Sequence, residues 1–168
     1  NGLQVTLTGK VAHTRSTPRP KRGNAGLGVA RITQLVDEIA WSHAPLAVGA
    51  IGHCDVFPNS RNIIPGRVVF PIDFRHPTQE VIDDMEARLR AGAREICDEI
   101  GLEMEIEQAG KFDPVEFDDG CVGAIRRAAE RLGYSHRDIV SGAGHDACWD
   151  NRLAPTAKGM RPCGGGLW

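Results

Sequence analysis

The stretch that decides the fold is residues 68–106, VVFPIDFRHPTQEVIDDMEARLRAGAREICDEIGLEMEI. Alternate positions of its first part are apolar, which predicts a strand with one buried face: Val68, Phe70, Ile72 and Phe74. Apolar residues then recur every three or four positions between Thr78, the expected N-cap, and Gly101, the expected stop, which predicts a helix. Residues 102–106 alternate apolar side chains with glutamate, as a strand with one wet face does.

Pro71 interrupts the first of these strands. A proline cannot donate a hydrogen bond to a neighbouring strand. The sequence therefore predicts that this strand lies at a sheet edge or contains a bulge at Pro71.

Upstream, the sequence predicts the other half of the same fold. Residues 3–7 alternate as a strand does, residues 9–24 form a long polar loop, and a helix spans about residues 25–41. Asn24 is the expected N-cap of that helix, and residues 46–56 are apolar enough for another strand. The order β-α-β-β-α-β over residues 3–112 predicts a ferredoxin-like α+β domain, with a four-stranded antiparallel sheet and both helices on one face.

After residue 114 the pattern changes. A third helix is predicted over about residues 119–132, followed by a glycine-rich tail without a closed core of its own. We therefore expect a complete domain at residues 1–114 and an incomplete segment of another domain at residues 115–168.

The composition of the chain argues against some classes of partner and of cellular location. The 20 Lys and Arg nearly balance the 22 Asp and Glu, which argues against nucleic acid or an anionic membrane as partner. One local basic cluster is interpreted as a solvated loop: Arg15, Arg19, Lys21 and Arg22. The absence of a long apolar run or signal pattern predicts a cytoplasmic protein. Five scattered cysteines are expected to be reduced and mostly buried: Cys54, Cys97, Cys121, Cys148 and Cys163.

Four features can carry chemistry: His13 in the long loop, Asn62 in a turn, Arg75 at a strand end, and residues 141–146, SGAGHD. Each has a plain structural interpretation. His13 can be a surface residue, Asn62 can cap a turn, and Arg75 can pair with Asp73. His145 and Asp146 can begin a helix whose dipole favours the acid at its N-terminus. The functional interpretation is a hydrolase that recognises anions, in which a guanidinium grips a carboxylate, an amide orients it, and an imidazole donates to an oxyanion.

Catalytic motifs of other kinds are missing from the sequence. We interpret the chain as having no H-x-D metal motif, no paired glutamates, no H-E-x-x-H and no G-x-S-x-G. Spacing alone therefore predicts no metal site and no serine nucleophile.

Four stretches together resemble the second half of the hydantoinase/carbamoylase amidohydrolases in order and spacing. They are residues 9–18 (GKVAHTRSTP), 58–66 (PNSRNIIPG), 73–77 (DFRHP) and 141–147 (SGAGHDA). The resemblance implies hydrolysis of a carbamoyl or ureido C–N bond in a small substrate that carries a carboxylate. It further implies a lid domain that forms a homodimer and reaches into the partner's site.

The resemblance also implies residue roles. His13 steadies the oxyanion, Asn62 and Arg75 hold the substrate carboxylate, and Gly144 with His145 line the pocket. The complete enzyme would use two divalent metal ions (Zn, Mn, Co or Ni). The family's metal ligands correspond to positions before residue 1, and one histidine would follow residues 166–168, so this chain alone is predicted to bind no metal and to be inactive. The chain departs from the family at Arg15, where the usual residue is glycine.

Two alternatives remain open from the sequence. One is a non-catalytic ferredoxin-like binding or interaction module. The other is the lid of a related metallopeptidase or aminoacylase. The pairing of Asn62 with Arg75 and the sequence around His145 favour the carbamoylase interpretation. The sequence does not identify the substrate, the metal or the effect of Arg15.

Overall fold

The computed structural model describes residues 1–161 and divides the chain into two compact units, Asn1–Pro114 and the segment from Val115 onward. The elements of the first unit are β1 (Gly2–Thr8), β2 (Ala12–His13), η1 (Arg19–Lys21), α1 (Ala25–Ser42), β3 (Val48–Ala50), β4 (Asp55–Phe57), β5 (Ile63–Ile64), β6 (Arg67–Arg75), α2 (Gln79–Ile100) and β7 (Glu103–Gly110). The predicted α+β order of the first unit is confirmed.

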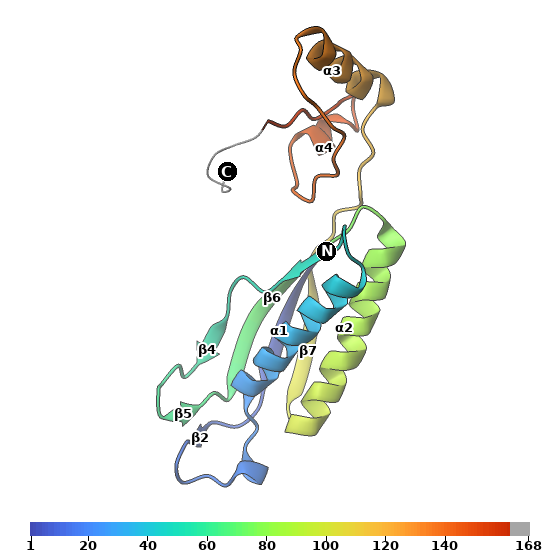
Figure 1. The fold of residues 1–168 in the computed structure, drawn as a ribbon. Coiled ribbons are helices and arrows are strands. Elements are labelled where there is room, and N and C mark those ends of the chain that lie inside the picture. Colours follow the sequence, from blue (N-terminus) through green and yellow to red (C-terminus); the bar gives the residue numbers. More distant parts are fainter. Residues whose placement is uncertain (162–168) are drawn as a thin grey trace. The chain divides into compact units, whose positions relative to one another are not determined.

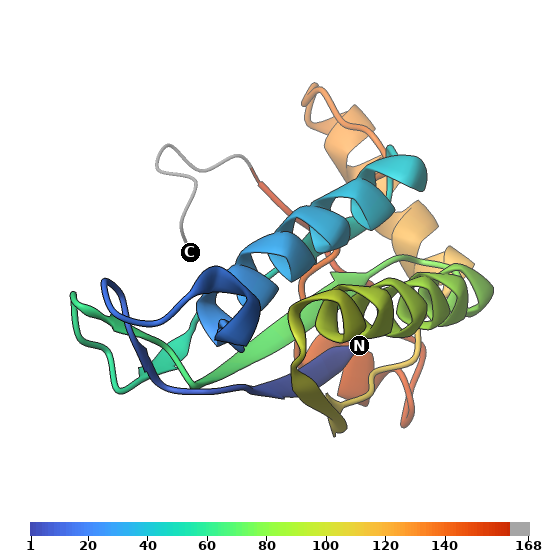
Figure 2. The same ribbon diagram turned by 90° about the horizontal axis from the view of Figure 1, so that it is seen from below.

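The main sheet is antiparallel, in the order β3-β6-β1-β7, and β4 also pairs with β6. Side chains alternate between buried and accessible along β1 and β6, so only one face of the sheet is covered. Both long helices cover that face, as Figures 1 and 2 show for α1 and α2. The opposite face is left accessible.

The core lies between this sheet face and the two helices. Its largest fully buried side chains are Phe70, Phe74, Leu3, Leu7, Ile32, Ile39, Ile72, Met85, Leu89, Val5, Val36 and Val68. The strand residues of this set come from the alternation read in the sequence, and the helical ones from its three- and four-residue spacing. Burial of these side chains is the main favourable term for folding the first unit.

The helix ends follow the predicted caps. The Asn24 side chain accepts a hydrogen bond from the Leu27 N–H at 3.2 Å, which caps α1. Gly101 ends α2 in the left-handed region with φ of 77°. Thr78 is at the N-cap of α2 but makes no side-chain cap bond, and its N–H donates to His76 Nδ1 instead.

The structure corrects the strand predicted over residues 46–56. Residues 46–56 form two short strands, β3 and β4, which makes the main sheet five-stranded rather than four-stranded. The pairs Ala50↔Asp73 and Asp55↔Val69 bracket Pro71, with one more residue between them on the β3–β4 side. The ladder is therefore broken opposite the residue that lacks an N–H. Of the two predictions for Pro71, the irregularity is confirmed and the edge position is wrong, because β6 lies between β1 and β3.

The second unit contains α3 (Asp119–Arg131) and α4 (Ala147–Asp150). The Asp118 carboxylate caps α3 by accepting from the Cys121 N–H at 2.8 Å, and this bond lowers the pKa of Asp118. Among its described residues, Ala147 is the one buried apolar side chain. The third helix is thus confirmed.

The thiols differ from their predicted burial. Cys97 is buried, and burial raises its pKa, but Cys54 is exposed and Cys121 and Cys148 are intermediate. The prediction that the cysteines are mostly buried is therefore wrong for the described ones, and Cys163 lies outside them. None of the helices within residues 1–161 combines the length and apolar character needed to cross a membrane.

Candidate functional site

A small second sheet brings two of the predicted site residues together. Strand β2 pairs with β5, with Ala12 opposite Ile64 and His13 opposite Ile63. One residue further, the Thr14 N–H donates to the Asn62 carbonyl at 3.1 Å. These bonds join two loops that leave the main sheet at one end, which Figure 1 shows below β4 and β6. We call residues 9–24 and 58–67 together the basic lobe.

The base of the basic lobe is a close approach of backbone segments. The Gly9 N–H donates to the Gly66 carbonyl at 2.7 Å, and the Lys10 N–H donates to the Gly23 carbonyl at 2.9 Å. A Cβ on Gly9 would lie 2.2 Å from the Gly23 oxygen, closer than any side chain tolerates. Glycine at this position therefore permits the approach that carries the two loops.

Arg22 holds the tip of the longer loop from inside. Its Nε donates to the Thr17 carbonyl at 2.8 Å, and its Nη2 donates to the Thr14 carbonyl at 2.6 Å. Arg22 was interpreted as one member of a solvated basic cluster, so its bonds to the loop carbonyls were not predicted. An arginine in a polar loop has no sequence pattern that indicates such bonds.

The side chains of His13 and Asn62 are both exposed, and each has one hydrogen-bonding atom already occupied. His13 Nδ1 accepts from the Arg15 N–H at 3.2 Å, so the hydrogen of the neutral ring is on Nε2. Asn62 Oδ1 accepts from the Ser60 hydroxyl at 2.8 Å, which leaves the Nδ2 hydrogens to donate. The two residues therefore present N–H donors rather than acceptors.

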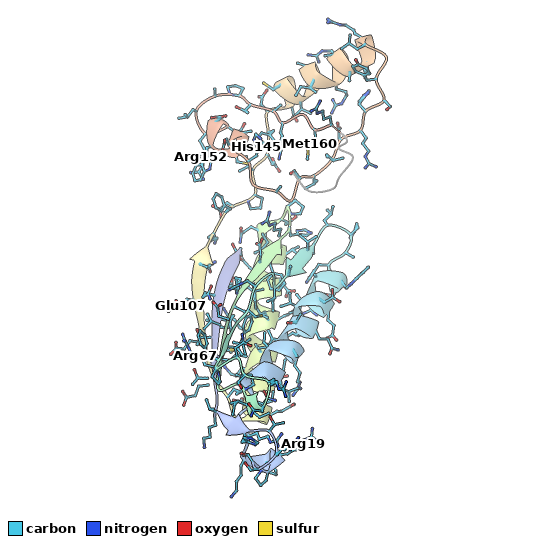
Figure 3. All side chains as sticks on the ribbon, turned by 90° about the vertical axis from the view of Figure 1, so that its left-hand side faces the viewer. Arg19, Arg67, Glu107, His145, Arg152 and Met160 are labelled. Carbon is cyan, nitrogen blue, oxygen red and sulfur yellow. The ribbon has the colours of Figure 1, made fainter. Side chains whose placement is uncertain are left out.

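The charge around these donors is positive throughout. The basic lobe contains seven lysines and arginines and no aspartate or glutamate, although the whole chain has a net charge of −2. The seven are Lys10, Arg15, Arg19, Lys21, Arg22, Arg61 and Arg67. Figure 3 shows Arg19 and Arg67 toward the same end of the first unit. Hydrogen-bond donors in a field of this sign favour an anionic ligand.

Arg75 lies at the other end of the sheet. It is the last residue of β6, eight residues after Arg67, which corresponds to about 27 Å along an extended strand. Its Nε and Nη2 donate to Asp73 Oδ2 at 2.8 and 2.5 Å, the pairing that the plain interpretation predicted. The structure thus brings His13 and Asn62 together and leaves Arg75 apart from them in one copy of the chain.

Gly144 and His145 belong to the second unit and are exposed. His145 Nδ1 accepts from the Ala147 N–H at 3.0 Å, so Nε2 again carries the hydrogen of the neutral ring. A Cβ on Gly144 would have no heavy atom within 4 Å, so packing does not explain this glycine. The roles of both residues remain predictions.

Residues 1–161 contain no group of three histidine, cysteine, aspartate or glutamate side chains that could hold a metal ion. The interpretation that the chain has no H-x-D motif is wrong, because residues 53–55 (HCD) and 136–138 (HRD) have this spacing. His53 Nε2 lies 3.1 Å from Asp55 Oδ1, with both side chains more than half exposed. The described residues therefore do not fit the two metal ions that the family resemblance implies.

Comparison with known proteins gives close relatives along almost the whole chain. It is 53% identical over 165 residues to an N-carbamoyl-L-amino-acid amidohydrolase from Rhizobium meliloti, covering 98% of the chain and 40% of the relative. It is 33% identical to the allantoate amidohydrolase of Escherichia coli K12, covering 85% of the chain and 35% of the relative. The chain thus spans about two fifths of the length of these relatives.

A solved structure shows the same fold. An amidase of the hydantoinase/carbamoylase family from Burkholderia multivorans is 52% identical with a TM-score of 0.88, covering 92% of this chain and 38% of that one. No protein-family model matches the chain. The ordered motifs, the fold and the identity to these relatives agree. The chain belongs to the hydantoinase/carbamoylase family of amidohydrolases, in a region corresponding to about two fifths of its relatives' length.

Proposed function

We propose that the first unit is the lid and dimerisation domain of a metal-dependent amidohydrolase that cleaves carbamoyl or ureido C–N bonds of substrates with a carboxylate. The observation that carries the proposal is the pairing of β2 with β5, which brings the backbone positions of His13 and Asn62 close together in a lobe without acids. His13 Nε2 and Asn62 Nδ2 are both N–H donors. The second unit is proposed to be part of the catalytic domain.

In this proposal each residue has a separate task. Asn62 donates to the substrate carboxylate and fixes its orientation, and Arg75 grips a carboxylate with its planar guanidinium. His13 donates from Nε2 to the oxygen that gains negative charge in the tetrahedral intermediate. Because the described residues form no metal site, the metal ions are assigned to the complete enzyme, and no step is derived from them here.

The separation of Arg75 from the basic lobe supports a homodimer. About 27 Å of strand is far longer than an N-carbamoyl amino acid, so one copy of the first unit cannot apply His13, Asn62 and Arg75 to one substrate. We propose that the basic lobe of one protomer and Arg75 of the other serve the same site. A two-fold axis then creates two identical composite sites.

The two sheet edges differ in what they offer a partner. At β3 and the adjoining end of α1, Trp41, Leu46 and Val48 expose 72%, 49% and 53% of their surface. At β7 the accessible face carries Glu103, Glu105 and Glu107, and these would repel a second copy of the same strand. We therefore propose the β3 edge with α1 as the dimer interface. The cytoplasmic location stays a prediction.

The guanidinium of Arg75 provides the sharpest test of the site. In a full-length protein containing this chain, Arg75→Lys should lower kcat/KM for N-carbamoyl amino acids by about two to three orders of magnitude, because an ammonium cannot form the two-donor fork. Arg94→Lys is the matched control, since Arg94 is an exposed arginine on α2 away from the proposed site. Unchanged turnover in Arg75→Lys would refute the carboxylate contact.

The dimer is tested by mixing two defective proteins. His13→Ala and Arg75→Ala homodimers should each be nearly inactive, whereas heterodimers of the two should regain one intact composite site. A random mixture of subunits should therefore recover about a quarter of wild-type activity, since half of the dimers carry one of two sites. Failure of the mixture to recover activity, with subunit exchange shown by mass, would refute the composite site.

A further inference from the structure

We propose that Arg15 binds a second anionic group of the substrate, so that the enzyme prefers ureido acids whose side chain itself carries a carboxylate. This inference rests on the proposed function and adds to it the substrate class. It concerns the part of the basic lobe that the roles of His13, Asn62 and Arg75 leave unexplained.

The backbone of Arg15 is fixed to the candidate oxyanion donor. Its N–H donates to His13 Nδ1 at 3.2 Å, and the Thr17 N–H donates to the His13 carbonyl at 3.3 Å, which closes a turn around Arg15. The same turn is joined to the other loop, because the Thr14 N–H donates to the Asn62 carbonyl at 3.1 Å. The Arg15 backbone therefore contacts the His13 ring and lies one residue from the bond that joins Thr14 to Asn62.

The guanidinium of Arg15 is exposed, and within residues 1–161 no hydrogen bond or ion pair satisfies it. Some other arginines of the chain are engaged by protein groups. Arg22 donates to two loop carbonyls, and Arg31 pairs with Glu99 at 2.6 Å. Arg15 thus contributes neither to bracing the loop nor to an ion pair, although it lies beside the candidate site.

The basic lobe supplies no internal anion for Arg15, since it has seven cations and no acid. A guanidinium matches a carboxylate with two parallel hydrogen bonds, and the field of the neighbouring cations favours negative charge on the ligand. The substrate's own carboxylate is assigned to Asn62 and Arg75. The anion left for Arg15 is therefore a second one, on the substrate side chain.

The test compares two substrates of nearly equal shape that differ by one charge, N-carbamoyl-aspartate and N-carbamoyl-asparagine. A full-length protein containing this chain should prefer the aspartate compound in kcat/KM by about tenfold, which corresponds to about 1.4 kcal/mol. Arg15→Gln should reduce this preference to about twofold or less. The preference is a ratio measured on one protein sample, so it does not depend on how much of a variant is correctly folded.

Lys21→Gln is the matched control, because it removes the same charge from the basic lobe at η1, outside the turn that holds Arg15. It should keep most of the preference. Equal turnover of both compounds by the wild type, or a preference that survives Arg15→Gln, would overturn the proposal. An equal loss in both variants would overturn it too, because the general field of the lobe would then be responsible. If the wild type hydrolyses neither compound nor any other N-carbamoyl amino acid, the proposed function itself fails.

Discussion

The two units of the chain differ in how much hydrophobic core each of them buries. The first unit buries a continuous core from both long helices and four strands, whereas the described part of the second unit buries one apolar side chain, Ala147. Leu132, Tyr134 and Leu153 of the second unit expose 66%, 67% and 89% of their surface. His13, Asn62 and Arg75 therefore lie in a unit with a continuous core, while Gly144 and His145 lie in a unit whose described residues bury almost no apolar side chain.

The largest expected effect compares one leucine from each unit. Leu89 is fully buried under the sheet, so Leu89→Ala should destabilise the first unit by about 2–5 kcal/mol through lost burial and a cavity. Leu153→Ala in the second unit should change the same unfolding free energy by no more than about 0.5 kcal/mol. Urea denaturation followed by far-UV circular dichroism measures both. Equal destabilisation by the two substitutions would contradict the difference between the units.

A second comparison uses two glycines with the same backbone conformation. Gly101 follows α2 with φ of +77°, and Gly133 follows α3 with φ of +72°. A Cβ on either meets no heavy atom within 4 Å, so alanine introduces only backbone strain, about 1–2 kcal/mol. Gly101→Ala should lower the stability of the main unfolding transition by that amount.

Gly133→Ala should leave the main transition in place, because α3 contributes no side chain to the core of the first unit. Asparagine tolerates the left-handed region better than alanine, so Gly101→Asn should recover part of the loss. A shift of the main transition by Gly133→Ala would show that the two units unfold together.

The smallest expected effect is a pH dependence confined to the second unit. The lowered pKa of Asp118 means that its cap bond stabilises α3 above the ordinary carboxyl value of 3.8 and is lost as the pH falls through the lowered value. The protection of the Cys121 amide, measured by NMR as its exchange rate relative to the intrinsic rate at the same pH, should therefore fall in this acid range. Asp118→Asn keeps an oxygen acceptor but does not titrate, so it should remove the pH dependence of this protection. Persistence of the dependence in this variant would assign it to another group.

The fold was predictable from sequence where burial repeats locally. The alternation along β6 and the spacing along α2 each describe one buried face, so strand, helix and end positions follow within a residue or two. The division of residues 46–56 into β3 and β4 was not predicted, because it depends on these residues pairing with β6 opposite Pro71. That relation exists only after the strands are ordered.

The sequence names candidate site residues, whose roles stay predictions, but it does not show how they are arranged. The two residue pairs of β2 and β5 are too short to give a periodic signal, so the contact between the loops of His13 and Asn62 could not be read from sequence. The separation of Arg75 did have a signal. A nine-residue strand ends far from where it begins, and the sequence placed Asn62 before that strand and Arg75 at its end.

The pairing of β2 with β5 determines how this region can be transplanted into another protein. In the Thr14 to Asn62 and Gly9 to Gly66 bonds, residues 9–24 supply the N–H donors and residues 58–67 supply the carbonyl acceptors. Grafting either segment alone onto a related scaffold therefore leaves its donors or its acceptors to meet a foreign backbone. A chimera that exchanges both segments together keeps every one of these bonds. We therefore expect the proposed substrate preference to be transferred only when the two loops are exchanged as one part, although the 33 residues at positions 25–57 separate them in the sequence.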